Sequence, residues 1–136
     1  MPTLQSATYL VSDYDEAIAF FVTALGFVLR EDEARANGSR RVVVGPEDPA
    51  STGLVLALSE SDVRGRQAGG KVAFFLETDD FAGLHARMLT AGVTFREEPR
   101  YEAYGTVAVF EDPWGMPWDL IQPPAAASGQ EAGLSE

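Results

Sequence analysis

The sequence contains two copies of one structural unit, and this repetition limits the folds that the chain can adopt. Residues 12–31 align with residues 78–97 at a constant offset of 66. The matched positions are Asp13 with Asp79, Gly26 with Gly92, and Arg30 with Arg96. Two copies of one unit in a single chain predict two similar modules.

Each aligned segment is predicted to form a helix, near residues 13–25 and 79–91. Asp13 and Asp79 are N-cap candidates, and a glycine follows the end of each segment. Between them, apolar residues recur at helical spacing and form one stripe per helix. The stripes are Tyr14, Ile18, Phe21 and Leu25, then Phe81, Leu84, Met88 and Ala91. We expect both stripes to face the core.

The segments that flank the helices predict strands, and a second sequence similarity extends the repeat to the later strands. The stretch "GPEDPASTGLVLAL" resembles "VFEDPWGMPWDLI" at an offset of 64. Each half therefore reads as a βαβββ module, and neither half can easily bury a four-stranded sheet alone. We predict an α+β fold in which both modules form one curled, eight-stranded mixed sheet around a cavity, with the helices on its convex side.

The expected organisation is one domain over residues 1–122, followed by a flexible tail. The modules cover residues 4–58 and 71–122, with a polar, glycine-rich linker at 59–70, and the tail is 123–136. The predicted strands are 4–11, 27–34, 39–45, 53–58, 71–78, 93–98, 104–111 and 117–122.

Composition argues against several classes of partner. The formal net charge is −11, and the few cations are scattered, so nucleic acid and anionic membranes are poor partners. No apolar run approaches the length of about 20 residues that spans a bilayer. The chain has no cysteine and its start does not resemble a secretory signal, so we expect a cytoplasmic protein.

Alternation along the strands separates an apolar face from a mixed face. The helices should cover the apolar faces, and the mixed faces should line a hollow suited to a small molecule. Ser6 and Thr8 lie on the mixed face of the first strand. Ala73, Phe75 and Glu77 lie on that of the fifth strand, and Asp119 lies on that of the last.

Further candidates come from two other strands. One of Arg40 and Arg41 should face the hollow, where we take Arg41 to contact an anionic group or Asp119. Tyr104 and Phe110 share a strand face that could line the hollow. His85, the only histidine, lies on the flank of the second helix, and its position contradicts a catalytic triad.

The motifs together resemble the vicinal-oxygen-chelate superfamily, which includes glyoxalase I, bleomycin-resistance proteins and extradiol dioxygenases. The stretches that carry the resemblance are "SDYDEAIAFFVTALGF", "TDDFAGLHARMLTAGV" and "EDPWGMPWDLIQP". The resemblance implies paired βαβββ modules around a cavity and often a homodimer. Many members hold a divalent metal there through His and Glu side chains. One such fold hosts many chemistries.

The metal ligands implied by the resemblance are mostly missing from this sequence. The positions that commonly carry histidine are Ser6 and Ala73, and a fourth-strand ligand would fall near Val55 or Ala57. Asp119 stands where the last ligand, a glutamate, is common. Catalytic metal sites usually need about three protein ligands, so we expect no metal and no cofactor.

The leading functional hypothesis is metal-independent binding of a small organic molecule by a homodimer, with sequestration or resistance as the purpose. The first alternative is a lyase or dioxygenase whose divalent metal recruits Asp119, Glu77 and water. The second is a metal-free enzyme with Asp119 as general base. Asp119 is expected to accept a hydrogen bond from Arg40, Arg41 or Tyr104. The predicted ligand-binding residues are Ser6, Thr8, Arg41, Ala73, Phe75, Glu77, Tyr104, Phe110 and Asp119.

Overall fold

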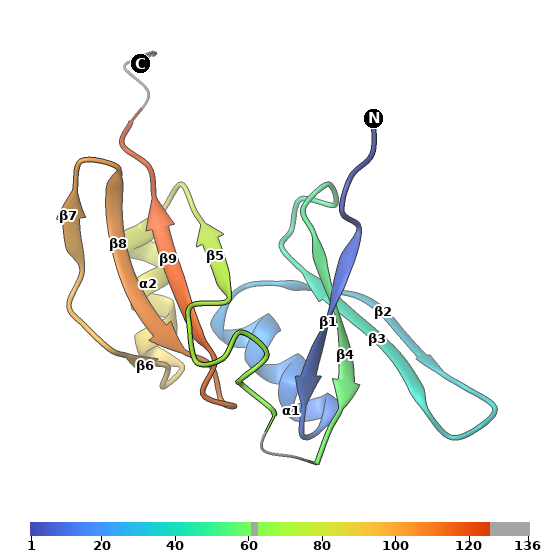
Figure 1. Ribbon diagram of the computed structural model, residues 1–136. Helices are drawn as coiled ribbons and strands as arrows, with labels where there is room; N and C mark the ends of the chain where they lie inside the picture. The colour runs from blue at the N-terminus through green and yellow to red at the C-terminus, as the bar shows by residue number, and fades with distance from the viewer. Residues whose placement is uncertain (61–62, 126–136) are drawn as a thin grey trace.

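A computed structural model describes residues 1–60 and 63–125. The first βαβββ module forms a sheet in the order β1-β4-β3-β2, the first sheet, in which β1 and β4 run parallel and the other pairs are antiparallel (Figure 1). Its elements are β1 (Ser6–Val11), α1 (Tyr14–Ala19), the π-helix η1 (Phe20–Ala24), β2 (Val28–Ala34), β3 (Arg40–Gly45) and β4 (Gly53–Leu58).

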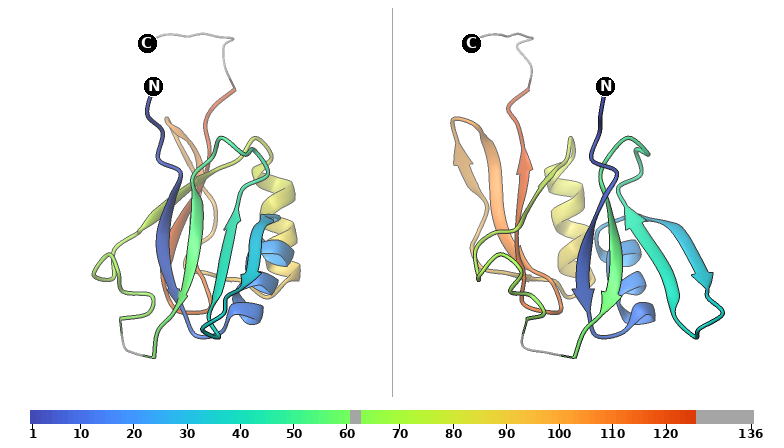
Figure 2. Two further views of the ribbon diagram at one scale, coloured as in Figure 1. Left: turned by 90° about the vertical axis from the view of Figure 1, so that its right-hand side faces the viewer. Right: turned by 45° about the vertical axis from the view of Figure 1, so that its right-hand side comes forward.

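The second module repeats this arrangement with one additional strand. Its sheet, the second sheet, has the order β5-β9-β8-β6, and β7 also pairs with β8. Both helices lie on the same side of the two sheets (Figure 2). The elements are β5 (Phe74–Glu77), α2 (Phe81–Thr90), β6 (Thr94–Phe95), β7 (Arg100–Glu102), β8 (Gly105–Glu111) and β9 (Pro117–Gln122). We call the face of each sheet opposite the helices its outer face.

The α+β class and the two βαβββ modules are confirmed, but the prediction of one continuous eight-stranded sheet is wrong. The described residues form two sheets, of four and five strands, and β1 and β5 are not paired with each other. The linker occupies part of the β1 edge instead. The side chain of Gln67 accepts from Leu10 N at 2.9 Å and donates to Thr8 O at 3.0 Å, as a neighbouring strand would do.

The first helix begins as predicted, and the second begins one residue later. Asp13 accepts a hydrogen bond from Asp15 N at 2.9 Å and is the N-cap of α1. In α2 the N-cap is Asp80, whose carboxylate accepts from Gly83 N at 3.0 Å. The assignment of Asp79 as the second N-cap is therefore wrong, because its neighbour supplies the same side-chain chemistry at the actual boundary.

Both helices end where the repeat predicts. Gly26 and Gly92 have φ values of 73° and 85°, in the left-handed region that glycine adopts without steric strain. The last part of the first helix, Phe20–Ala24, is a π-helix. No helix among the described residues is long and apolar enough to span a membrane. Most of the predicted tail, residues 126–136, lies outside the described part of the chain.

An aromatic core joins the two modules. Phe21 of the first module lies 6.0 Å from the Trp118 ring of the second, and Tyr9 lies 5.5 Å from Phe74. Trp118 also stacks on Phe110, with ring centroids 5.7 Å apart. All five side chains belong to this core or pack against it. Since its members come from both halves, the modules share one hydrophobic core.

A buried carboxylate fixes the final turn within that core. Asp112 is only 5% exposed and accepts hydrogen bonds from the Tyr9 hydroxyl, from Trp118 Nε1 at 3.0 Å, and from the backbone N–H groups of Trp114 and Met116. Burial raises the pKa of Asp112, and these donors oppose the rise. Four donors satisfy a carboxylate that would otherwise be costly to bury, so this cluster is structural.

Candidate functional site

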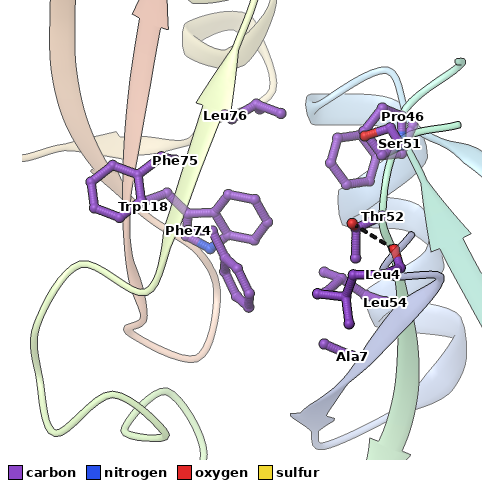
Figure 3. Close-up of a pocket in the computed structure, with 11 residues that line it drawn as sticks. Leu4, Ala7, Pro46, Ser51, Thr52, Leu54, Phe74, Phe75, Leu76 and Trp118 are labelled. Atoms are coloured by element: carbon purple, nitrogen blue, oxygen red, sulfur yellow. Dashed lines mark hydrogen bonds between the residues drawn. The ribbon is translucent and has the colours of Figure 1, made fainter. Parts of the chain in front are cut away.

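A hollow of about 360 Å³ lies between the two sheets and is the best candidate for a functional site (Figure 3). Phe74, Leu76 and Trp118 extend from the second sheet toward the first module, and Leu4 and Leu54 lie across from them (Figure 3). We call this space the inter-sheet hollow. Its lining residues are Leu4, Ala7, Phe27, Pro46, Ser51, Thr52, Leu54, Phe74, Phe75, Leu76 and Trp118.

Strand alternation and one loop hydrogen bond build the two walls. Phe74 and Leu76 share the face of β5 that carries Trp118 on the neighbouring strand, while Phe75 lies on the opposite face (Figure 3). On the other wall, Thr52 Oγ1 donates to Leu4 O at 2.8 Å. This bond ties the segment before β1 to the loop before β4, so both belong to one wall.

The chemistry of the inter-sheet hollow favours binding over acid–base catalysis. Its lining is mainly aliphatic and aromatic, with the hydroxyl groups of Ser51 and Thr52 as polar side-chain groups. Among the described residues that line it, none has a titratable side chain. Its volume falls in the range of about 300–1,000 Å³ that is typical of small-molecule sites.

Asp119 lies away from this hollow, on the outer face of the second sheet. It is opposite Phe75 on one neighbouring strand and Val109 on the other. Its Oδ1 atom is buried and has no hydrogen-bond partner among the described residues. Burial raises the pKa of the Asp119 carboxyl, the Arg100 guanidinium lowers it, and Glu97 raises it.

The expectation that Asp119 accepts a hydrogen bond from Arg40, Arg41 or Tyr104 is wrong. Arg40 pairs with Asp15 and Asp32 in the first module, at 3.1 and 2.9 Å. Arg41 Nε donates to Glu31 at 2.9 Å, across β2 and β3. Both arginines are thus neutralised within the first module, by carboxylates of α1 and β2.

The structure separates the predicted site residues, most of which lie on the outer faces of two different sheets. Ser6, Thr8 and Arg41 lie on the outer face of the first sheet, as the register of its strands requires. Phe75, Glu77 and Asp119 lie on the outer face of the second sheet, and Ala73 precedes β5. Tyr104 is 56% exposed in the turn before β8. Of the nine, Phe75 alone lines the inter-sheet hollow.

Two other positions are explained by packing. Phe110 is fully buried in the core, so the expectation that its strand face lines a hollow does not hold. The opposite face of β8, with Val107 and Val109, is equally apolar, and alternation could not tell which face is covered. His85 stacks on Phe81 at 5.5 Å and contacts Phe95, as a flank residue of α2.

The residues at the implied metal position do not fit a metal. Ser6 offers a single hydroxyl, Ala73 offers no ligand atom, and Ser6 and Asp119 lie on the outer faces of different sheets. Within residues 1–60 and 63–125, no group of three or more His, Cys, Asp or Glu side chains could hold an ion. A catalytic metal site usually has about three such protein ligands.

Most of the residues that line the inter-sheet hollow are not among those predicted from the sequence. Ala7, Phe74, Leu76 and Trp118 alternate with the mixed-face residues, so strand alternation predicts that they lie on the apolar faces that the helices cover. They do lie on those faces. At their position between the two sheets, however, the helices do not cover the faces, and the residues line the hollow. Apolar residues in an open part of such a face look the same in sequence as core residues.

Comparisons with known proteins agree with the architecture. A sequence model of the Glyoxalase/Bleomycin resistance protein/Dioxygenase superfamily matches residues 3–120. An uncharacterized protein of Shewanella frigidimarina is 48% identical over 120 residues, which are 83% of this chain and 87% of that protein. YurT, an uncharacterized protein of Bacillus subtilis, is 29% identical over 82% of this chain and 92% of its own.

Solved structures show the same fold. TnmS3, described as an antibiotic binding protein from Streptomyces sp. CB03234, superposes with a TM-score of 0.73 and 31% identity. The match covers 90% of this chain and 97% of TnmS3. A glyoxalase I mutant from Zea mays matches with a TM-score of 0.68 and 19% identity, over 89% of this chain and 47% of that one, which shows the fold alone. With the family match over residues 3–120, these findings establish that the chain belongs to the Glyoxalase/Bleomycin resistance protein/Dioxygenase superfamily.

Proposed function

We propose that the protein binds a small organic molecule with a large apolar surface in the inter-sheet hollow, for sequestration or resistance. The observation that carries the proposal is a space of about 360 Å³ with aromatic and aliphatic walls and a hydroxyl-bearing loop at one side. Such walls favour an apolar ligand by removing its surface from water, and a few hydroxyl groups can orient it. TnmS3, the similar protein described as antibiotic-binding, supports this class of ligand.

Binding in this proposal does not involve a metal. The residues at the implied ligand positions supply one carboxylate, which would leave an ion mostly hydrated and weakly held. Elemental analysis of protein purified without an affinity tag tests this part of the proposal. We expect far less than one equivalent of zinc, nickel, manganese or iron per chain. Stoichiometric metal that is lost in Asp119→Asn would contradict it.

We further propose that the protein is a cytoplasmic homodimer. The two open sheets leave strand edges uncovered, and the second sheet exposes large side chains that a partner copy would cover. Phe75 and Tyr101 are 69% and 82% exposed. Sedimentation at micromolar concentration should show a species of twice 14.6 kDa. A species of the single-chain mass at all concentrations would refute the dimer.

A second candidate function is a metal-free enzyme in which Asp119 is the general base. The observation that favours it is the buried, unpartnered Oδ1 atom, since an acceptor without a donor in the protein is available to a proton of a bound molecule. Burial raises the pKa of this carboxyl, which makes it a stronger base. Asp119 does not line the inter-sheet hollow, so binding there is the better supported function.

A ligand screen separates the two functions. Aromatic antibiotics and other small organic compounds would be tested by thermal shift, and each hit would be incubated with the protein and recovered for mass spectrometry. The binding proposal predicts saturable stabilisation and unchanged ligand. A chemically altered ligand, formed by the wild type and not by Asp119→Asn, would establish the enzyme instead.

A further inference from the structure

The repeat places equivalent arginines, Arg30 and Arg96, in the two modules, and the two differ in their ion pairs. In the second module Arg96 pairs with Glu111, with Nε and Oε2 2.6 Å apart. Its counterpart in the first module, Arg30, forms no ion pair with any carboxylate in the described part of the chain. Among the described residues, the first module therefore has the cation without a counter-ion.

Strand register shows which residue of the first module lies where the second module has its counter-ion. Thr94 lies opposite Glu111 in the pairing of β6 with β8, and the equivalent pair in β2 and β3 is Val28 with Gly45. Gly45 thus occupies the ladder position at which the second module carries its carboxylate. A glycine here removes both the charge and the side-chain volume.

The space that Gly45 and Gly53 leave is filled by the Arg30 guanidinium. A Cβ atom at Gly45 would lie 2.4 Å from Arg30 Cζ, and one at Gly53 would lie 2.8 Å from Nη1. Nη2 donates to the carbonyl oxygens of Pro46 and Asp48, at 3.0 and 3.1 Å. These two bonds fix the plane of the guanidinium, while Nε and Nη1 donate to no acceptor in residues 1–60 and 63–125.

Arg30 lines a second hollow, of about 190 Å³, on the outer face of the first sheet. Ser6, Glu31 and Arg41 also line it, and we call it the Arg30 hollow. Glu31 is engaged by Arg41 at 2.9 Å, so two arginines and one glutamate leave a formal charge of 2 − 1 = +1. This local positive charge stands out in a chain whose net charge is −11.

We propose that the Arg30 hollow binds the oxyanion group of a small molecule, a carboxylate, phosphate or sulfate. A guanidinium held in a fixed plane with free N–H groups matches the paired oxygens of such an anion, and the pre-set orientation limits the entropy lost on binding. The Ser6 hydroxyl can add a donor. The Arg30 hollow includes Ser6 while the inter-sheet hollow includes Ala7, on the opposite face of β1, so each can be tested without the other.

Nuclear magnetic resonance on the unsubstituted protein tests the proposal directly. The Nε–Hε resonances of Arg30 and Arg96 would be followed while inorganic phosphate, or in a second arm acetate, replaces chloride at constant ionic strength. We expect a saturable shift of the Arg30 resonance with at least one anion and none at Arg96. The arm that responds identifies the phosphate-like or carboxylate class. No saturable shift with either anion overturns the proposal.

Two variants supply the matched comparison. Arg30→Gln should weaken anion binding by about tenfold or more, because a charge-assisted contact is lost, whereas Arg96→Gln should leave it unchanged. Equal weakening in both variants would show unspecific attraction to surface charge and refute the site. Because Arg30 also holds the loop after β3, circular dichroism must show that Arg30→Gln is folded. The resonance test in the wild type decides the question if it is not.

Discussion

Leu4→Ala should weaken ligand binding in the inter-sheet hollow without destabilising the fold. The Leu4 side chain is 70% exposed, so the core loses little when it is shortened. Its backbone is held separately, through the Leu4 carbonyl and Thr52 Oγ1. A ligand that covers this side chain gains about 1–2 kcal/mol from it, which corresponds to about a 5- to 30-fold change in Kd.

The assay for Leu4→Ala uses the neutral fluorescent probe N-phenyl-1-naphthylamine, titrated with wild-type and variant protein. Leu58→Ala is the matched control, because Leu58 is a 54% exposed leucine at the end of β4 that does not line the hollow. We expect a weaker Kd for Leu4→Ala alone, with thermal midpoints of both variants near that of the wild type. Unchanged probe affinity in Leu4→Ala, or equal weakening in Leu58→Ala, would refute the assignment of the hollow.

Three further predictions test the rest of the structure. Tyr9→Phe removes a buried donor to Asp112 and should lower the free energy of unfolding by about 1–3 kcal/mol in urea titrations. An unchanged free energy of unfolding would show that this hydrogen bond between the modules does not stabilise the fold. Asp80→Ala should destabilise by about 0.5–2 kcal/mol and Asp79→Ala by much less, because Asp80 caps α2; the reverse order would refute that boundary. Because burial raises the folded-state pKa of Asp119, its carboxyl favours folding at low pH and opposes it once ionised. Asp119→Asn should therefore stabilise the protein near neutral pH, with a gain that shrinks as the pH falls through the folded pKa of Asp119, and denaturation of both proteins across that range measures it.

The sequence predicted the features that depend on local signals. Both helices and the paired modules could be located from the repeat at offset 66, the apolar stripes and the terminal glycines. Each of these signals depends on residues that are close together in the sequence. The one-residue error at the second helix reflects two adjacent aspartates of equal capping ability. Only the tertiary position of Asp80 distinguishes them.

The arrangement of the two sheets could not be predicted in the same way. β1 and β5 lie in different sheets, and Gln67, a linker residue, bonds with its side chain to the edge of β1. Nothing in the polar, glycine-rich sequence around it marks that role. The site prediction assumed one continuous sheet, and it therefore grouped residues such as Ser6 and Asp119 that the structure places on different sheets.

The missing counter-ion of Arg30 was visible in sequence only in part. Arg30 and Arg96 are matched by the aligned helices at offset 66, and Gly45 and Glu111 share that offset. The stretch that begins at Gly45, however, resembles the one that begins at Val109 at an offset of 64, which pairs Gly45 with Val109 instead. Strand pairing places Gly45 and Glu111 at equivalent positions. The longer loop after β3 hides this equivalence from the sequence.

The most direct test of the central claim is the location of the bound probe in protein that has been treated with a chelator. Nuclear Overhauser contacts would be measured between N-phenyl-1-naphthylamine and methyl groups of the protein. We expect contacts with Leu54, Leu76 and Ala7, which line the inter-sheet hollow. Probe binding only after metal is restored, or contacts confined to outer-face methyl groups such as those of Val55 and Val109, would contradict it.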